Sequence, residues 1–307
     1  MHLPNSSILA QIKRKVLRTT GFLMVVALFL SATIVPQGIT DATAHEAPQS
    51  ESLRLVRLGQ RLQNPPRTVR FTSATTTPTY SAVPTVQPKV VATNDSDLLP
   101  VVRQKDIKPE HQKLADKVLR ALPSGCRDNL KNFYVNYELN PKNRGLGGAS
   151  TIIVTGNVPD AEFAALITHE CGHVIDLGAL RGTKESGMSA FVDGSTPMYN
   201  NDPSVQYYSI SWTNAHTKKT SVKEADFVSG YGASDIFECF AEAFAFFALQ
   251  NKEFQRLAKT NPALKAKYEF MRDVVFKNTP PLSEGSYVRE LRTPWDVTLL
   301  PYQLHAK

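Results

Sequence analysis

Cysteine is scarce in this chain, with only Cys126, Cys171 and Cys239 among 307 residues. Small secreted domains that depend on a disulfide framework contain many more cysteines, so such a framework is excluded and at most one intramolecular bridge can form. The spacing is also unlike that of a cysteine-based zinc site. We expect Cys171 and Cys239 to be small buried side chains, and a Cys171–Cys239 bridge stays open as an alternative.

The chain also lacks a concentrated basic surface, although its formal net charge is +7. Residues 1–100 hold ten Lys/Arg and five Asp/Glu, whereas residues 101–307 hold 25 and 23. The excess positive charge therefore lies mainly in the N-terminal hundred residues. Nucleic-acid binding requires basic side chains gathered on one face, so we expect no nucleic-acid partner.

Long apolar runs are rare, and the longest, residues 21–35 (GFLMVVALFLSATIV), lies near the N-terminus. Four basic residues between positions 13 and 18 precede it, and no acidic residue does, which is typical of an export signal. Because the run is short for a spanning helix and Ala42-x-Ala44 suits cleavage, we predict a signal peptide over residues 1–44. The alternative is an uncleaved anchor, with membrane association through residues 21–35. Either places the remaining chain outside the cell, secreted or tethered to the outer face of the membrane.

Helical or strand periodicity is missing from residues 45–104, which are rich in Pro, Thr and Ser and contain a single glycine, Gly59. Such a composition favours an extended, semi-rigid chain over a packed domain. We therefore predict a disordered linker, within which residues 51–63 are a candidate for a short basic amphipathic helix.

Helical periodicity is present from residue 105 to residue 280, and we predict one domain with these bounds. Leu114, Val118 and Leu122 recur at helical spacing after Pro109, which suits a first helical turn. The same reasoning, with capping residues at the ends, predicts three further helices: about 159–177 ended by Gly178, about 234–250 capped by Ser234 or Asp235, and about 262–276.

Fewer residues show the alternation that is typical of β-strands than show helical periodicity. Phe133, Val135 and Tyr137 alternate with polar residues, and Ile152 begins a β-branched run. Between them, the glycine-rich stretch 145–149 is expected to be a flexible hairpin tip. The predicted fold class is therefore α+β, a mostly helical domain with a small β-sheet, followed by a Pro-rich C-terminal tail over residues 281–307.

The sequence His-Glu-x-x-His stands at residues 169–173, inside a predicted helix. His169 and His173 are four residues apart and lie on one face of that helix, so both imidazoles can reach one metal ion about 2 Å away. Glu170 lies beside them, where it would act as general base towards a water molecule. The pattern predicts one zinc ion (Zn2+) per chain.

A catalytic zinc site needs a third protein ligand. One zincin class places a histidine six residues beyond the second motif histidine, and this class is excluded because that position is Ala179. Asp176 lies on the same helical face as the histidines. Three ligands from one helix would strain a tetrahedral arrangement around the metal, so we expect Asp176 to cap the helix or orient a histidine N–H. The other candidates are Glu238 and Glu242, whose carboxylates lie on an otherwise apolar helix and need a partner if buried.

The two helices carry a family resemblance. HECGH, followed some sixty residues later by YGASDIFECFAEAF, resembles the catalytic domain of anthrax lethal factor and its relatives. These relatives include small secreted Pro-Pro endopeptidases and belong to the Glu-zincin metallopeptidases. The resemblance spans about residues 108–278 and is specific only at these two helices, and the other domains of the toxin have no counterpart here.

The resemblance implies a zincin-like fold and a role for each site residue. His169, His173 and Glu238 would hold zinc, and Glu170 would be the general base. Tyr231 would stabilise the oxyanion, and Glu242 would hydrogen-bond to a histidine ligand. Judged without the resemblance, Tyr231 can also be a packing residue.

These roles imply an exported zinc metalloendopeptidase, a hydrolase acting on a peptide or protein substrate. Substrates of such enzymes commonly add a strand to a sheet edge, and residues 150–156 are the candidate edge. The alternative function is a catalytically weak or inactive zincin-like surface protein for binding or adhesion, which the intact motif residues disfavour. An intramembrane protease is excluded because acidic and polar residues surround the motif.

Overall fold

The computed structural model describes residues 97–304, which belong to one compact unit. The predicted signal or anchor over 1–44, the linker up to residue 96 and the candidate helix at 51–63 lie outside the described residues. Within residues 97–304, none of the helices has both the length and the apolar character needed to cross a membrane.

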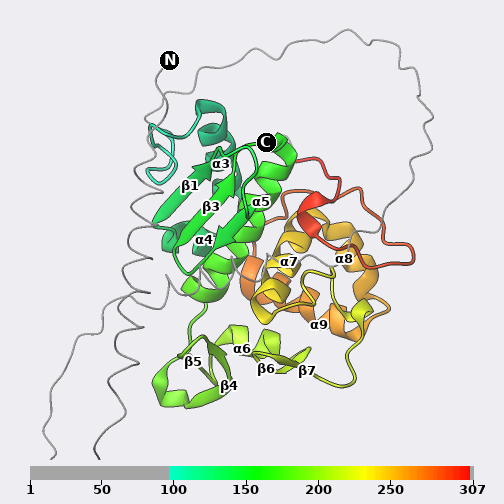
Figure 1. Cartoon of the computed structure of the whole chain (residues 1–307). Coiled ribbons are helices and arrows are strands. Elements are labelled where there is room, and N and C mark those ends of the chain that lie inside the picture. The colour runs from blue at the N-terminus through cyan, green and yellow to red at the C-terminus, as the bar shows by residue number, and fades with distance from the viewer. Residues whose placement is uncertain (1–96, 305–307) are drawn as a thin grey trace, which may run out of the picture. The chain divides into compact units, whose positions relative to one another are not determined.

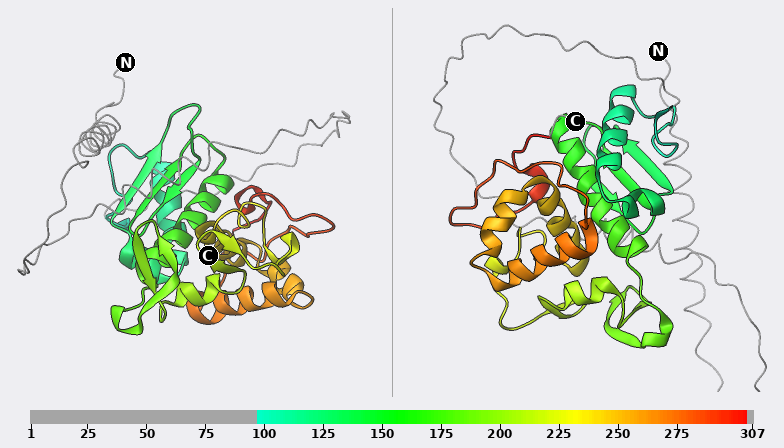
Figure 2. Two further views of the ribbon diagram at one scale, coloured as in Figure 1. Left: turned by 60° about the horizontal axis from the view of Figure 1, so that its bottom comes forward. Right: turned by 180° about the vertical axis from the view of Figure 1, so that it is seen from behind.

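One central helix organises the part of the fold that holds the site. This helix, α5, lies between a three-stranded sheet and a group of helices from the C-terminal half (Figures 1 and 2). Helices and small sheets together agree with the predicted α+β class. The helices around the centre are α3 (Pro109–Ala121), α4 (Ser124–Asn129), α5 (Asp160–Val174), α7 (Ile236–Leu249), α8 (Asn251–Ala258) and α9 (Pro262–Phe270).

The three-stranded sheet differs from the predicted hairpin. Strands β1 (Asn132–Asn136) and β3 (Thr151–Thr155) are parallel, and β2 (Gly145–Gly147) pairs antiparallel to β3 on its other side. The first three residues of the glycine-rich stretch 145–149, predicted as a flexible tip, therefore form a strand. The prediction that residues 150–156 form a sheet edge is also wrong, because β3 is central and β2 is the edge beside α5.

The predicted helix over 159–177 is α5, which continues as a π-helical turn, η2 (Ile175–Ala179). Gly178 was expected to end the helix, but the turn passes through it and ends at Ala179. A side chain at position 178 would lie 2.1 Å from the carbonyl oxygen of Ala149, so close backbone packing accounts for the glycine.

The region between α5 and α7, where no periodicity was recognised, consists of short elements. They form two small antiparallel sheets, β4 with β5 and β6 with β7, and one short helix. The elements are η3 (Lys184–Ser186), β4 (Met188–Asp193), β5 (Thr196–Tyr199), α6 (Pro203–Tyr208), β6 (Trp212–Asn214), β7 (Thr217–Lys218) and η4 (Glu224–Asp226).

Helix α7 begins as predicted, because the Asp235 carboxylate accepts a hydrogen bond from the backbone N–H of Phe237 at 2.9 Å. The next helix, α8, was not predicted. The last predicted helix is α9, which Asn261 caps and which continues as the π-helical η5 (Met271–Phe276).

The packed part of the chain is longer than the predicted domain of residues 105–280. Leu98 and Val102, from the predicted linker, are buried in the core. In the predicted tail, Leu282 and Val297 are buried, and Val297 begins a short 3-10 turn, η6 (Val297–Leu299). The C-terminal segment therefore belongs to the fold and reaches the candidate site.

Candidate metal centre

Helix α5 presents the two motif histidines to α7. Every residue from Phe163 to Val174 is buried, so the motif lies inside the protein. At Gly172 the two helices approach closely, since a Cβ there would lie 2.8 Å from the Cα of Ala241. The small residues thus bring the backbone of α7 within reach of His169 and His173.

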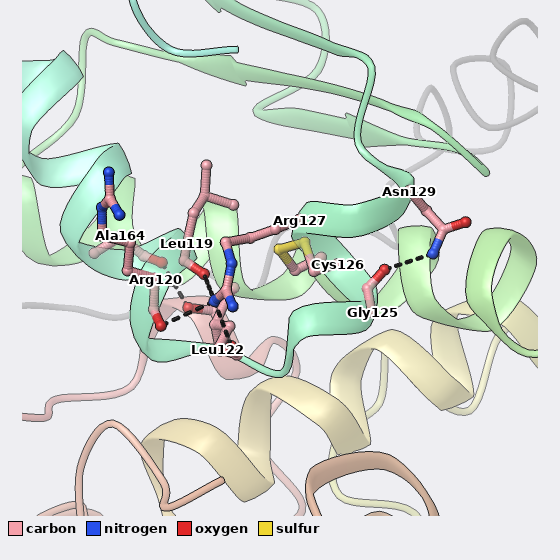
Figure 3. The surroundings of a disulfide bond; sticks show 10 residues. Leu119, Arg120, Leu122, Gly125, Cys126, Arg127, Asn129 and Ala164 are labelled. Carbon is pink, nitrogen blue, oxygen red and sulfur yellow. Dashed lines mark hydrogen bonds between the residues drawn. A yellow bond between two sulfur atoms is a disulfide. The ribbon is translucent and has the colours of Figure 1, made fainter. Parts of the chain in front are cut away.

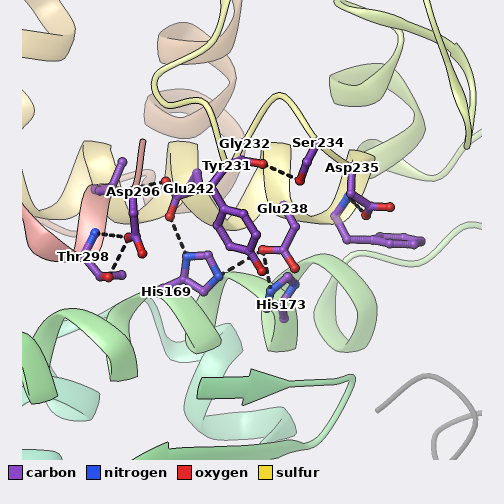
Figure 4. Close-up of polar contacts among 12 residues, drawn as sticks. His169, His173, Tyr231, Gly232, Ser234, Asp235, Glu238, Glu242, Asp296 and Thr298 are labelled. Carbon is purple, nitrogen blue, oxygen red and sulfur yellow. Dashed lines mark hydrogen bonds and ion pairs between the residues drawn. The ribbon is translucent and has the colours of Figure 1, made fainter. Parts of the chain in front are cut away.

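Helix α7 contributes Glu238 to the same point. Its Oε2 atom lies 3.2 Å from Nε2 of His169 and 3.5 Å from Nε2 of His173 (Figure 4). The ligand atoms that His169, Glu170 and His173 offer lie within 4.8 Å of one another. The three residues predicted as metal ligands and the predicted base are therefore gathered in one place, and all four are buried.

Glu242 lies one turn further along α7 and contacts the other side of His169. Its Oε1 atom is 2.9 Å from Nδ1 of His169. If Nδ1 carries the proton and donates it to this carboxylate, Nε2 keeps its lone pair for a metal ion. Glu242 is thus placed where it would fix the orientation and the tautomer of His169.

Strand β2 lies directly against Glu170. A Cβ at Gly145 would be 2.0 Å from Oε1 of Glu170, and a Cβ at Gly147 would be 2.5 Å from Oε2. Only glycine allows the backbone to approach the carboxylate so closely. This explains the glycine-rich stretch by its packing on the site.

Tyr231 stands over His169 from the loop that precedes α7. The two rings are stacked, with centroids 6.0 Å apart and an angle of 20° between their planes. Its hydroxyl points to the space between the histidines and Glu238 (Figure 4). Burial, together with the carboxylates of Glu238 and Glu170, holds the pKa of this phenol well above its usual value, so it remains a hydrogen-bond donor.

Asp176 is fully buried in the π-helical turn after α5. Both of its carboxylate oxygens lie 2.6 Å from the hydroxyl of Tyr208, and its backbone carbonyl accepts a hydrogen bond from Ser204. These contacts tie η2 to α6, which gives Asp176 a partner that the sequence did not suggest.

The C-terminal segment supplies residues that the sequence analysis missed. Trp295, Asp296 and Thr298 line a pocket of about 190 Å³ beside His169 and Glu170. The ring of Trp295 lies 6.3 Å from that of Tyr231. This segment has no periodicity and follows a Pro-rich stretch, so no local signal in the sequence points to the site.

The buried groups shift one another's protonation. Burial raises the pKa of Glu170 to about 8 and also raises that of Glu242. Burial would likewise raise the pKa of Glu238, but His173 and His169 hold it well below its usual value. For His169, burial is the largest single influence and lowers the pKa, but Glu238, Glu242 and Glu170 together hold it well above its usual value. The centre therefore favours positive charge beside its carboxylates.

A divalent cation suits these residues. Three buried carboxylates, of Glu170, Glu238 and Glu242, surround two imidazoles, and Oε2 of Glu170 has no hydrogen-bond partner within residues 97–304. A buried carboxylate without a partner is costly, and a cation between these groups would remove that cost. Two histidine nitrogens and one carboxylate oxygen are the donor set of many catalytic zinc sites.

The cysteines differ from the prediction. Cys126 on α4 and Cys171 on α5 form a disulfide (Figure 3), whereas Cys239 is free and buried. The alternative Cys171–Cys239 bridge is therefore wrong, as is the prediction that Cys171 is only a small buried side chain. Cys171 faces α4, so the disulfide fixes the motif helix from the side opposite α7.

Comparison of the chain with known protein families, with curated proteins and with solved structures finds no match.

Proposed function

We propose that this chain is an exported zinc-dependent endopeptidase with a zincin fold of the Glu-zincin type. The observation that supports this most strongly is the meeting of α5 and α7, which brings Oε2 of Glu238 within 3.5 Å of both motif imidazoles. Two helices separated by about sixty residues thus provide two nitrogens and one oxygen at one point. The carboxylate of Glu170 stands beside them without being needed as a ligand.

Each residue of the site has a separate role in the proposed reaction. A zinc ion held by His169, His173 and Glu238 would polarise a peptide carbonyl and lower the pKa of a coordinated water. Glu170 accepts a proton from the attacking water and delivers it to the leaving amine. The hydroxyl of Tyr231 donates a hydrogen bond to the oxygen on which negative charge develops.

The substrate backbone is proposed to pair with β2. Within residues 97–304 this strand has only β3 as a strand partner, and its other edge pairs with no strand. It also touches Glu170 through Gly145 and Gly147. An extended peptide added to this edge would carry its scissile bond past the general base.

Export is supported by the Cys126–Cys171 disulfide, since disulfides persist in oxidising compartments and are rare in reducing ones. The apolar run at residues 21–35 and the cleavage pattern after it are the signals that would direct export.

The test of the proposed function is Glu170→Gln in the full-length chain, with Glu269→Gln, at a half-buried position of α9, as the matched control. We expect Glu170→Gln to keep zinc and to lose nearly all cleavage of a peptide library, because glutamine cannot accept the proton. Glu269→Gln should cleave like the wild type. Equal cleavage by wild type and Glu170→Gln would contradict the mechanism. A wild type that binds zinc and cleaves nothing would favour a binding protein instead.

A further inference from the structure

A short C-terminal segment, residues 294–298, connects parts of the metal centre that are distant in sequence. We call it the C-terminal strap. The carbonyl oxygens of Pro294 and Trp295 accept hydrogen bonds, each 2.7 Å long, from the backbone N–H groups of Gly230 and Tyr231. The backbone N–H of Val297 donates to Oε2 of Glu242 at 2.9 Å. The strap thus holds both the Tyr231 loop and the carboxylate beside His169.

The strap is fixed on its other side by Arg144, the residue before β2. The guanidinium of Arg144 lies 3.0 Å from Oδ2 of Asp296 and donates to Oγ1 of Thr298 at 2.5 Å. A third contact, at 3.0 Å, reaches Glu162 on α5. The backbone of Arg144 is held as well, since its carbonyl accepts a hydrogen bond from Thr155 on β3. Arg144 therefore joins the sheet, the motif helix and the strap.

We propose that the strap is a positioning element of the metal centre and that the Arg144–Asp296 ion pair holds it in place. The inference rests on the proposed zinc site. Arg144 and Asp296 line the pocket, but the contacts through which they would act on the metal ligands are indirect. They act through Val297 and Glu242 on His169, and through Trp295 on Tyr231.

The first of these routes depends on both oxygens of Glu242. Oε1 contacts Nδ1 of His169, while Oε2 accepts the N–H of Val297. A carboxylate bonded at both oxygens cannot rotate freely, so the imidazole it contacts is held in one orientation. Without Val297 in place, one oxygen of a fully buried carboxylate would lose its backbone donor.

The second route is packing against the tyrosine loop. A Cβ at Gly230 would lie 2.6 Å from the indole ring of Trp295, so the indole covers the backbone there. Trp295 is also next to the phenol of Tyr231. Displacement of the strap would break the two backbone hydrogen bonds to Gly230 and Tyr231 and remove the packing of Trp295 on this loop. The side chain of Tyr231, which the proposed reaction needs, would then be held less firmly.

The experiment compares Arg144→Gln and Asp296→Asn with Arg272→Gln, all in the full-length chain. Arg272 pairs with Asp273 through two hydrogen bonds on an exposed part of η5, so it controls for loss of an arginine–carboxylate pair. Hydrogen exchange at the Gly230 and Tyr231 amides is measured in zinc-free protein. Zinc affinity is measured by competition with a chromophoric chelator, and kcat and KM are measured with a cleaved peptide.

We expect both site variants to speed exchange at these two amides and to raise the zinc Kd about tenfold, as loss of a partner behind a ligand commonly does. The kcat should fall with little change in KM, and Arg144→Lys should restore part of the zinc affinity. The double variant should lose no more than the larger single variant, because either substitution alone already breaks the Arg144–Asp296 ion pair. Arg272→Gln should match the wild type in every measurement.

Unchanged exchange and unchanged zinc affinity in both site variants would overturn the inference. An effect of Arg144→Gln with none of Asp296→Asn would overturn the role of the Arg144–Asp296 ion pair, since Arg144 would then act through Thr298 or Glu162. A wild type that binds zinc but cleaves nothing would contradict only the proposed peptidase activity. Hydrogen exchange and zinc affinity still test the role of the strap, because neither measurement needs a substrate.

Discussion

At the scale of single residues, two glycines determine how close the sheet comes to the proposed base. Position 145 faces the Glu170 side chain, because the three atoms nearest to a Cβ there all belong to Glu170. Position 147 faces Glu170 and also His173, with two atoms of the histidine 2.9 Å from a Cβ. Substitutions at the two positions can therefore distinguish an effect on the proposed base from an effect on a proposed ligand.

This difference predicts unequal effects of one added methyl group. Gly145→Ala should push aside the flexible end of Glu170 and lower kcat at least tenfold while zinc affinity stays near that of the wild type. Gly147→Ala should weaken zinc binding as well, because the imidazole of His173 must move. Peptide cleavage and chelator competition on both variants check this. Equal zinc affinities in the two variants would contradict it.

Tyr231 offers a second prediction at this scale. Tyr231→Phe keeps the ring that stacks on His169 but removes the hydroxyl, so zinc affinity should be retained. If the hydroxyl supports the developing oxyanion, kcat should fall by about 100-fold, the usual cost of losing one such donor. Tyr134→Phe, on β1 at the far side of the sheet from β2, is the control. An unchanged kcat in Tyr231→Phe would make this tyrosine a packing residue.

At the scale of secondary-structure elements, helix α5 is held from several sides. Helix α7 packs closely at Gly172, β2 covers Glu170, and the Cys126–Cys171 disulfide ties α5 to α4. Helix α4 is itself fixed to the end of α3, because Arg127 donates to the backbone carbonyls of Leu119, Arg120 and Leu122 (Figure 3). The motif helix is thus fixed by contacts with three neighbouring elements.

Loss of the disulfide should therefore lower stability. The bridge joins two residues with a sequence separation of 45. Without this cross-link the unfolded chain gains conformational freedom, so the free energy of unfolding should fall by up to about 4 kcal/mol. Urea unfolding of the Cys126→Ser/Cys171→Ser double variant measures this, with Cys239→Ala as the control for loss of a free cysteine. Mass spectrometry that finds three free thiols in the non-reduced wild type would contradict the bridge.

The elements that the sequence predicts well are those whose signals are local. Helices α3, α5 and α7 follow from apolar periodicity, Pro109 and the cap at Asp235, and the His-Glu-x-x-His motif lies where its spacing requires. Strand β2 was missed because three residues of Gly-Leu-Gly carry no strand pattern, and their pairing depends on β3. The strap was missed because its contacts are remote, with Val297 55 residues from Glu242 and Asp296 152 residues from Arg144.

At the scale of the whole molecule, the proposed zinc ion would join parts of the chain that are distant in sequence. His169 and His173 come from α5 and Glu238 comes from α7. The loop that carries Tyr231 and the C-terminal strap lie beside them. A ligand that binds only the folded chain stabilises it in proportion to the logarithm of its concentration over Kd. Zinc should therefore raise the stability of the whole unit and not only of the site.

Removing zinc with a chelator should lower Tm in a way that depends on Glu238. At a free zinc concentration of 100 times Kd the stabilisation is about 2.7 kcal/mol, which corresponds to a Tm difference of about 5–10 °C for a domain of this size. Glu238→Ala should show little or no zinc-dependent shift, since it lacks the ligand from α7, whereas Glu269→Ala should shift like the wild type. Thermal scans with and without chelator measure all three. A full zinc-dependent shift in Glu238→Ala would mean that α5 binds the metal alone, and Glu238 would then have no place among the ligands.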